Sequence, residues 1–177
     1  MEILFALITL SLLLGFLLKI SFYTRRGVAA VALAAGCLVR LALPWLMTLS
    51  GSEVESWLAG AAGMGEWSVV VVVGALLSAA FCFTHPSGRF RPLFYYPGLS
   101  APLAICLAWA QIPFIRPGID FTRFTYLVTA VTPLLIYGGG RLMRRLLPGE
   151  DERLEGLFIT DILLILLTVA ATGALTL

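Results

Sequence analysis

The sequence predicts an all-α fold: a polytopic integral membrane protein that forms one bundle of six transmembrane helices. Two observations lead to this prediction. The chain of 177 residues is 60% hydrophobic and only 12% charged, whereas about a quarter of the residues in a soluble domain are charged. The charged residues fall between apolar stretches of roughly 20 residues, the length of helix that crosses a bilayer core of about 30 Å.

Six apolar stretches in chain order account for nearly the whole sequence as a single domain. They cover residues 3–22, 27–49, 67–84, 94–112, 122–141 and 156–176. The first stretch has no basic residues before it, and Lys19, Arg25 and Arg26 follow it, which is the reverse of a secretory signal. We therefore expect this stretch to be retained as the first transmembrane helix.

A short helix is predicted on the outer membrane surface between the second and third spans, at residues 52–63. Ser52 is a suitable N-cap, and Glu55 three residues later completes a capping box. Trp57 gives this helix an apolar side that can lie on the bilayer.

Loop charges predict that both termini lie on the non-cytoplasmic side. Lys and Arg are more frequent in cytoplasmic loops than in external ones. Of the 12 Lys and Arg residues, nine fall on one side of the predicted bundle, and only Arg116 and Arg123 fall in loops on the other side. We expect the loops near Arg25, His85 and Arg144 to be cytoplasmic, and the protein to lie in the cell membrane, the inner membrane of a bacterium.

Composition and motifs argue against several classes of function. The net charge of +2 is spread over short loops, so nucleic acid is not an expected partner. The three cysteines stand far apart in apolar spans, and the sequence contains no metal-ligand set, nucleophile with a base, or paired carboxylates. We therefore expect no metal, no cofactor and no catalytic activity, and a membrane-embedded lipid-modifying enzyme is the weakest alternative.

Pro86-Ser87-Gly88 resembles part of the motif of membrane lipid phosphatases. That family continues with a histidine after the glycine and requires a second histidine elsewhere. Here Arg89 follows the glycine, and the chain has a single histidine. One histidine cannot act both as nucleophile and as general acid, so the resemblance does not extend to the activity.

The same inner loop offers three side chains for a lipid headgroup. His85, Arg89 and Arg91 are candidates to bind a lipid phosphate at the inner membrane surface. A solvated turn that obeys the positive-inside rule is the alternative interpretation.

Arg40 is the main candidate for a functional contact, because an ionisable side chain within a membrane span is costly and usually faces protein or water. Ala32, Gly36 and Arg40 recur every four residues, so they share one helix face, and the small residues allow a neighbouring helix to approach. We expect Arg40 to point into the bundle. No acid of the chain lies at its depth, so its partner is a set of carbonyls and hydroxyls, an outer glutamate, an acid of a partner subunit or an anionic small molecule.

The last span carries a polar face formed by Asp161, Thr168 and Thr172, which lie within about 20° of one another around the helix. The helical rise places Asp161 at the height of Lys19 and the two threonines nearer the height of Arg40. A Lys19–Asp161 pair that only fixes two helices is one interpretation, and a functional pair is the other.

The fifth span contains Thr129, Thr132 and Pro133. A proline inside a helix frees a carbonyl about one turn earlier and bends the helix. We expect the carbonyl freed near Thr129 to be available to Arg40 or to an ion. Asp120 is a suitable N-cap for this span.

Two classes of function fit these features. The first is a non-catalytic small integral subunit of a larger membrane complex for transport or envelope assembly, with Arg40 in contact with a partner or ligand. The second is a small solute transporter or substrate-binding membrane component with a polar site between the second, fifth and sixth spans. Size and helix number resemble those of the substrate-binding components of vitamin importers. The expected partners are membrane lipids, partner subunits and an anionic small molecule.

Overall fold

The computed structural model describes residues 2–46, 48, 61–83, 98, 100–115, 118 and 120–175. Within these residues every regular element is a helix, which confirms the all-α prediction. The elements are α1 (Glu2–Ile20), α2 (Arg25–Leu46), α4 (Ala61–Phe83), α6 (Ser100–Ile115), α7 (Phe121–Leu146) and α8 (Glu150–Leu175). Of the surface helix expected at 52–63, residues 52–60 lie outside the described part of the chain, and residues 61–63 begin α4.

Helices α7 and α8 extend into charged segments beyond the apolar stretches from which the spans were predicted. α7 continues to Leu146 through Arg144 and Arg145, and α8 already begins at Glu150. Hydropathy falls where the charges begin, but a helical backbone tolerates charged side chains. The acidic first turn of α8 also interacts favourably with the helix macrodipole.

The start of α7 is fixed by the predicted N-cap. The Asp120 carboxylate accepts hydrogen bonds from the backbone N–H groups of Thr122 and Arg123, at 3.0 and 3.4 Å. This satisfies two of the backbone donors that the first turn of a helix leaves without intrahelical partners.

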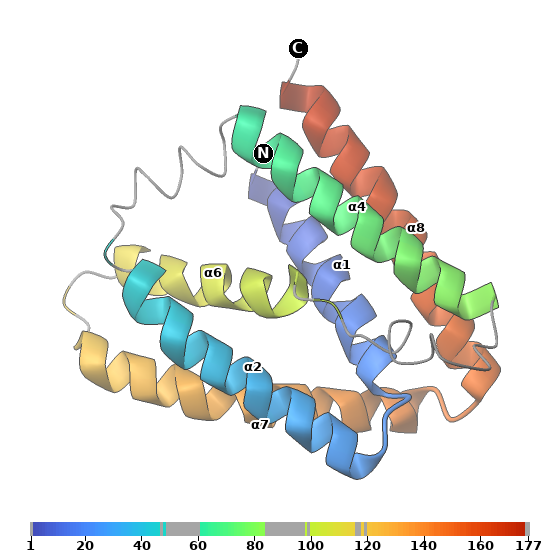
Figure 1. The fold of residues 1–177 in the computed structure, drawn as a ribbon, viewed down its shortest axis with the longest axis horizontal. Coiled ribbons are helices and arrows are strands. Elements are labelled where there is room, and N and C mark those ends of the chain that lie inside the picture. Colours follow the sequence, from blue (N-terminus) through green and yellow to red (C-terminus); the bar gives the residue numbers. More distant parts are fainter. Residues whose placement is uncertain are drawn as a thin grey trace.

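The contacts between helices divide them into two groups (Figure 1). α1, α4 and α8 form one group, in which α8 packs against both α4 and α1. α2, α6 and α7 form the other group, in which α2 packs against both α7 and α6. α1 also contacts α6 and α7, so it joins the two groups.

Gly36 allows α2 and α7 to approach closely. A Cβ atom at Gly36 would lie 2.5 Å from Cγ of Pro133 and 3.3 Å from the carbonyl oxygen of Thr129. Ala32, one turn earlier on the same face of α2, is buried as well. The small-residue face of α2 is therefore the face that packs against α7.

Two arginines hold the turn that connects α1 to α2. The Arg144 guanidinium on α7 donates hydrogen bonds to the carbonyl oxygens of Ser21 and Tyr23. Arg153 on α8 donates to the same Ser21 carbonyl at 3.2 Å, and its guanidinium stacks 4.8 Å from the centre of the Phe22 ring. Ser21 is fully buried, so these donors replace water at the end of α1.

Two of the described helices are long and apolar enough to cross a membrane, Arg25–Leu46 and Glu150–Gly173. Shorter apolar helical stretches cover Ala6–Ile20 and Ser68–Ala80. The length and composition of these helices indicate membrane association, and they do not by themselves establish six spans.

Candidate functional site

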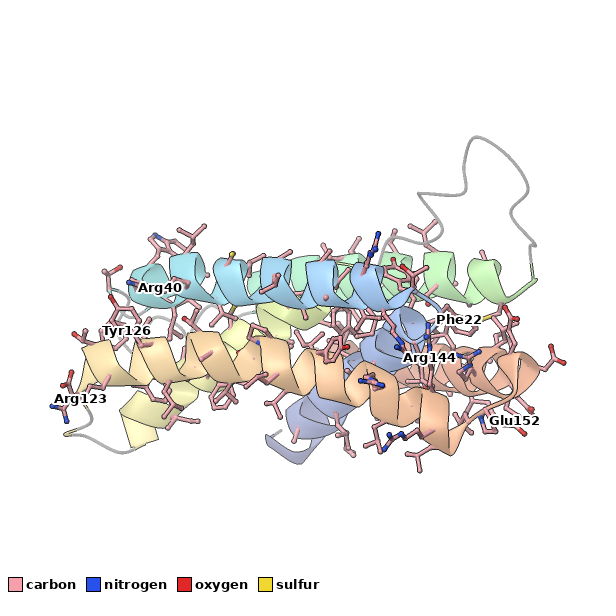
Figure 2. The ribbon with its side chains drawn as sticks, turned by 90° about the horizontal axis from the view of Figure 1, so that it is seen from below. Phe22, Arg40, Arg123, Tyr126, Arg144 and Glu152 are labelled. Carbon is pink, nitrogen blue, oxygen red and sulfur yellow. The ribbon has the colours of Figure 1, made fainter. Side chains whose placement is uncertain are left out.

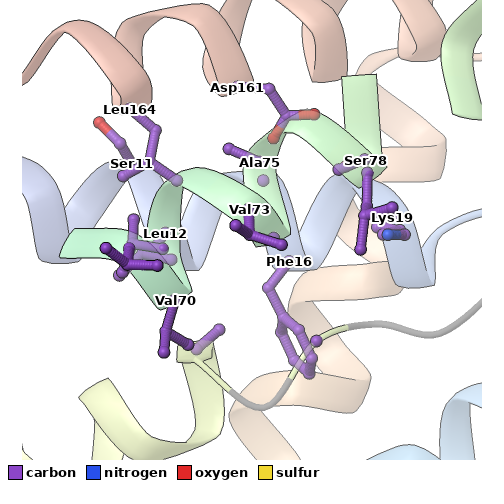
Figure 3. Close-up of a pocket in the computed structure, with 17 residues that line it drawn as sticks. Ser11, Leu12, Phe16, Lys19, Val70, Val73, Ala75, Ser78, Asp161 and Leu164 are labelled. Atoms are coloured by element: carbon purple, nitrogen blue, oxygen red, sulfur yellow. The ribbon is translucent and has the colours of Figure 1, made fainter. Parts of the chain in front are cut away.

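A cavity of about 460 Å³ lies between α1, α4 and α8, with the start of α6 at its edge (Figure 3). α1 lines it with Ser11, Gly15 and Lys19, which recur every four residues and so share one helix face. α8 contributes Asp161, and α4 contributes a row of valines followed by Ser78. The wall is therefore largely apolar, with polar groups gathered toward one end.

Lys19 and Asp161 are the charged side chains of this cavity, and both are buried, with 8% and 4% of their surface exposed. The two side chains form no ion pair in the structure. Ser78 lies next to Asp161, and in Figure 3 it stands between Asp161 and Lys19. The opposite charges still attract each other across the cavity, because the surrounding apolar wall screens them poorly.

One oxygen of the Asp161 carboxylate lacks a hydrogen-bond donor. Among the described residues, Oδ2 of Asp161 is the one buried side-chain oxygen or nitrogen atom without a partner. A buried polar atom in this state costs free energy, and a buried carboxylate oxygen costs more than a neutral one. A molecule in the cavity that carries an N–H or O–H group would supply the missing donor.

Gly15 brings α1 close to this carboxylate. A Cβ atom at Gly15 would meet Oδ1 of Asp161 at 3.7 Å and Cγ2 of Thr160 at 3.6 Å, both ordinary contact distances. A larger side chain at Gly15 would reach into the cavity beside Asp161.

The structure does not bring together the polar residues that were expected at one site between α2, α7 and α8. α8 packs against α4 and α1, so its threonines belong to a different helix group from Arg40. The Thr168 hydroxyl donates to the carbonyl of Leu164 at 2.7 Å, and the Thr172 hydroxyl donates to the carbonyl of Thr168 at 3.1 Å. Both hydroxyl donors are thus used within their own helix.

The threonines of α7 behave in the same way. The Thr129 hydroxyl donates to the Thr125 carbonyl at 2.7 Å, and the Thr132 hydroxyl donates to the Val128 carbonyl at 2.8 Å. The Thr129 carbonyl, one turn before Pro133, faces Gly36 of α2. The carbonyl that the proline frees therefore lies at a helix contact.

Arg40 is half-buried between α2 and α7. Its guanidinium carbon lies 4.9 Å from the centre of the Tyr126 ring, within the range of a cation–π interaction. Figure 2 places Arg40 and Tyr126 near the end of the molecule that carries Arg123, away from the end with Arg144. Tyr126 is 60% exposed, so Arg40 lies at the surface of the helix pair. The sequence had instead predicted that Arg40 points into the interior of the bundle.

The loop residues His85, Arg89 and Arg91 lie outside the described residues. Cys37, Cys82 and Cys106 are free cysteines. No group of three or more His, Cys, Asp or Glu side chains within the described residues is arranged to hold a metal ion.

Sequence reasoning selected Lys19 and Asp161 but missed Ser11, Gly15 and Ser78. Ser11, Gly15 and Lys19 repeat the four-residue spacing of small and polar residues that drew attention to Arg40 on α2. The same pattern, applied to the first span, would have indicated a helix face with a close neighbour. Ser78 carried no comparable signal.

Comparison with models of known protein families, with curated proteins and with solved structures gives no match to this chain.

Proposed function

We propose that this chain is a six-span integral membrane protein and that the cavity between α1, α4 and α8 binds a small amphiphilic solute, as in a membrane transporter or a substrate-binding membrane component. The observation that carries the proposal is the buried, unpartnered Oδ2 of Asp161 in the wall of a 460 Å³ cavity.

The membrane location is supported by the outward faces of the helices. Large apolar side chains are exposed on α1, α2, α4, α7 and α8, including Leu10, Leu41, Val69, Leu134 and Leu166 at 62–79% exposure. A soluble monomer rarely leaves so many large apolar side chains in water, whereas lipid covers them without cost. The shorter helices then cross the bilayer together with the two long ones.

Reporter fusions test the six-span arrangement. A cytoplasmic reporter fused after Pro148 should be active, and one fused after Gly118 should be inactive, with the reverse pattern for a periplasmic reporter. If only the two long helices crossed the membrane, α7 would not cross it, and Gly118 and Pro148 would lie on the same side. Activity of the same reporter at both positions would contradict six spans.

The polar end of the cavity defines the chemistry of the solute. Asp161 accepts a donor or a cationic group, and Lys19 offers an ammonium to an anionic or carbonyl group. The valines of α4 surround an apolar body. The site is suited to a molecule with a polar, zwitterionic or amide-like end and a short apolar part.

Native mass spectrometry of the full chain, extracted from its own membranes in mild detergent, tests the binding role. The wild-type protein should retain a bound small molecule, and Asp161→Leu should lose it. Thr168→Val is a matched control, because Thr168 is also a buried polar residue of α8 but does not line the cavity. Loss of the bound mass in both variants, or retention in both, would contradict the proposal.

A second candidate is a non-catalytic subunit of a larger membrane complex, and Arg40 favours it. Arg40 forms no ion pair with any described residue, and its guanidinium lies over the exposed ring of Tyr126. A carboxylate of a neighbouring membrane protein would neutralise this charge and gain a charge-assisted hydrogen bond.

Affinity purification from native membranes followed by mass spectrometry tests the subunit role. Arg40→Leu should release a co-purifying membrane protein. Arg123→Leu is the control, since Arg123 lies near the same end of the molecule but already pairs with Asp120 at 3.2 Å. Co-purification that is equally strong in both variants would remove the argument based on Arg40.

A further inference from the structure

A second pocket, of about 150 Å³, lies between the N-terminus of α2 and the C-terminal part of α7. A cavity of about this volume holds a molecule the size of benzene. We call it the arginine pocket, because four arginines line it together with a tyrosine, a glycine and a valine: Arg25, Arg141, Arg144, Arg145, Tyr137, Gly140 and Val28.

The arginine pocket carries a concentrated positive charge. None of its four arginines forms an ion pair with a described residue, and no carboxylate lines the pocket. The acidic first turn of α8 lies near the same end of the molecule, as Glu152 and Arg144 show in Figure 2, but none of its residues is part of the wall. Four like charges around one small volume repel each other unless an anion lies between them.

The local structure orients these arginines. Tyr137, Gly140, Arg141 and Arg144 follow the spacing of one face of α7. The Arg141 guanidinium lies 5.8 Å from the centre of the Tyr137 ring. Arg144 donates to the α1–α2 turn, which still leaves guanidinium N–H groups free, because an arginine carries five such donors.

The two helices that form the pocket also carry exposed apolar side chains, which suit the hydrocarbon part of a ligand. Leu134 precedes Tyr137 by one helical turn on α7 and is 70% exposed, and Leu33 on α2 is 63% exposed. Both residues lie toward the middle of their helices, away from the charged end. An anion with acyl chains would place its head in the pocket and its chains along these leucines, whereas free phosphate would use only the pocket.

We propose that the arginine pocket binds the phosphate group of an anionic phospholipid, with its acyl chains along α2 and α7. Guanidinium groups suit phosphate oxygens because two parallel N–H donors match two acceptors. The inference rests on the proposed membrane location but not on the cavity between α1, α4 and α8, which lies in the other helix group.

The test uses the full chain, purified in mild detergent and titrated with phosphatidylglycerol under native mass spectrometry. The variant R141Q/R145Q removes two pocket charges and keeps Arg144 in its structural contacts. The affinity for the first bound lipid should fall by about tenfold or more, as expected when charge-assisted hydrogen bonds are lost. R26Q is the matched control: Arg26 is exposed and adjacent to Arg25 but does not line the pocket.

Three further outcomes decide the inference. An equal loss of affinity in R26Q would overturn it, because general surface charge would then explain binding. Retention of inorganic phosphate without retention of phosphatidylglycerol would overturn the lipid as the source of the phosphate. Displacement of the lipid by excess inorganic phosphate would support phosphate as the recognised group.

A separate measurement isolates the membrane location. Resistance of the expressed chain to extraction by alkaline carbonate tests whether it is integral to the membrane. A chain that resists extraction but does not discriminate R141Q/R145Q from R26Q would refute the arginine pocket and leave the membrane location intact. Equal thermal midpoints of the variants would show that the comparison is made between folded proteins.

Discussion

The α2–α7 pair and the α1–α4–α8 group differ in how their buried polar side chains are hydrogen-bonded. Between α2 and α7, Gly36 packs directly on Pro133, and the threonine hydroxyls donate within their own helix. Between α1, α4 and α8, a cavity remains open, and Asp161 keeps an oxygen without a donor. The threonine hydroxyls of the first region are satisfied within their own helix, whereas the second region leaves one oxygen of Asp161 without a donor.

This difference separates structural polarity from polarity that is available to a ligand. Sequence alone gave the threonines of α7 and α8 the same weight as Asp161, because all of them are polar residues in apolar helices. The structure shows that a threonine in a helix satisfies its own donor through the carbonyl four residues earlier. A carboxylate has no such local solution, since it can only accept.

Loss of the contact between the two groups has the largest expected effect. Arg144→Met removes two charge-assisted hydrogen bonds to the α1–α2 turn and leaves the buried Ser21 carbonyl with Arg153 alone. At about 1.5–3 kcal/mol for each hydrogen bond to a charged group, we expect a loss of roughly 3–6 kcal/mol. The thermal midpoint of the purified protein in detergent measures it, and Arg145→Met, on the exposed side of α7, should leave that midpoint nearly unchanged.

An intermediate effect is expected where α2 meets α7. Gly36→Ala places a methyl group 2.5 Å from the Pro133 ring and should destabilise the protein by about 1–3 kcal/mol through overpacking. Gly138→Ala is the control on α7, because its Cβ would meet nothing within 4 Å. That control should gain about 0.5–1 kcal/mol from the lower backbone entropy of the unfolded chain. Equal shifts in thermal midpoint for both variants would contradict the tight contact.

The smallest effect has the opposite sign and belongs to the open region. Asp161→Leu removes the unpartnered carboxylate oxygen and adds apolar volume inside the cavity. We expect a gain of about 1 kcal/mol in the ligand-free protein, near the low end of the cost of an unsatisfied buried polar group. A rise in the thermal midpoint together with loss of the bound solute would mark a site that trades stability for binding. A fall would indicate that Asp161 is structural.

The sequence predicted where helices occur more reliably than which helices are neighbours. Apolar runs marked the helices, and the N-cap role of Asp120 followed from its position before one of them. The helical rise also placed Lys19 and Asp161 at one height, and the structure puts both in the same cavity. Height along a helix follows from counting residues, so this part of the site could be predicted from the sequence.

The sequence did not allow the same prediction of which helices pack against each other. Nothing in α8 indicated that its polar side would face α4 and α1 and not α2, because both alternatives bury equally apolar surfaces. Arg40 was assigned to the interior on the basis of its small-residue face, but Gly36 and Ala32 fill that contact with α7, and the longer Arg40 side chain reaches the Tyr126 ring at the surface. Pairing of helices depends on side-chain shape across the contact, which a single sequence does not display.

The hydrogen bonds that Arg144 and Arg153 donate to the α1–α2 turn also constrain the order of folding. The hydrogen bonds from Arg144 and Arg153 to the turn join residues 121–132 positions apart. The ribosome synthesises the turn long before either arginine. The carbonyl oxygens of the turn therefore accept hydrogen bonds from water or lipid headgroups until α7 and α8 have been synthesised. α8, which carries Asp161, is likewise the last helix to be inserted. Until then the chain lacks both the complete set of hydrogen bonds to the turn and the complete cavity.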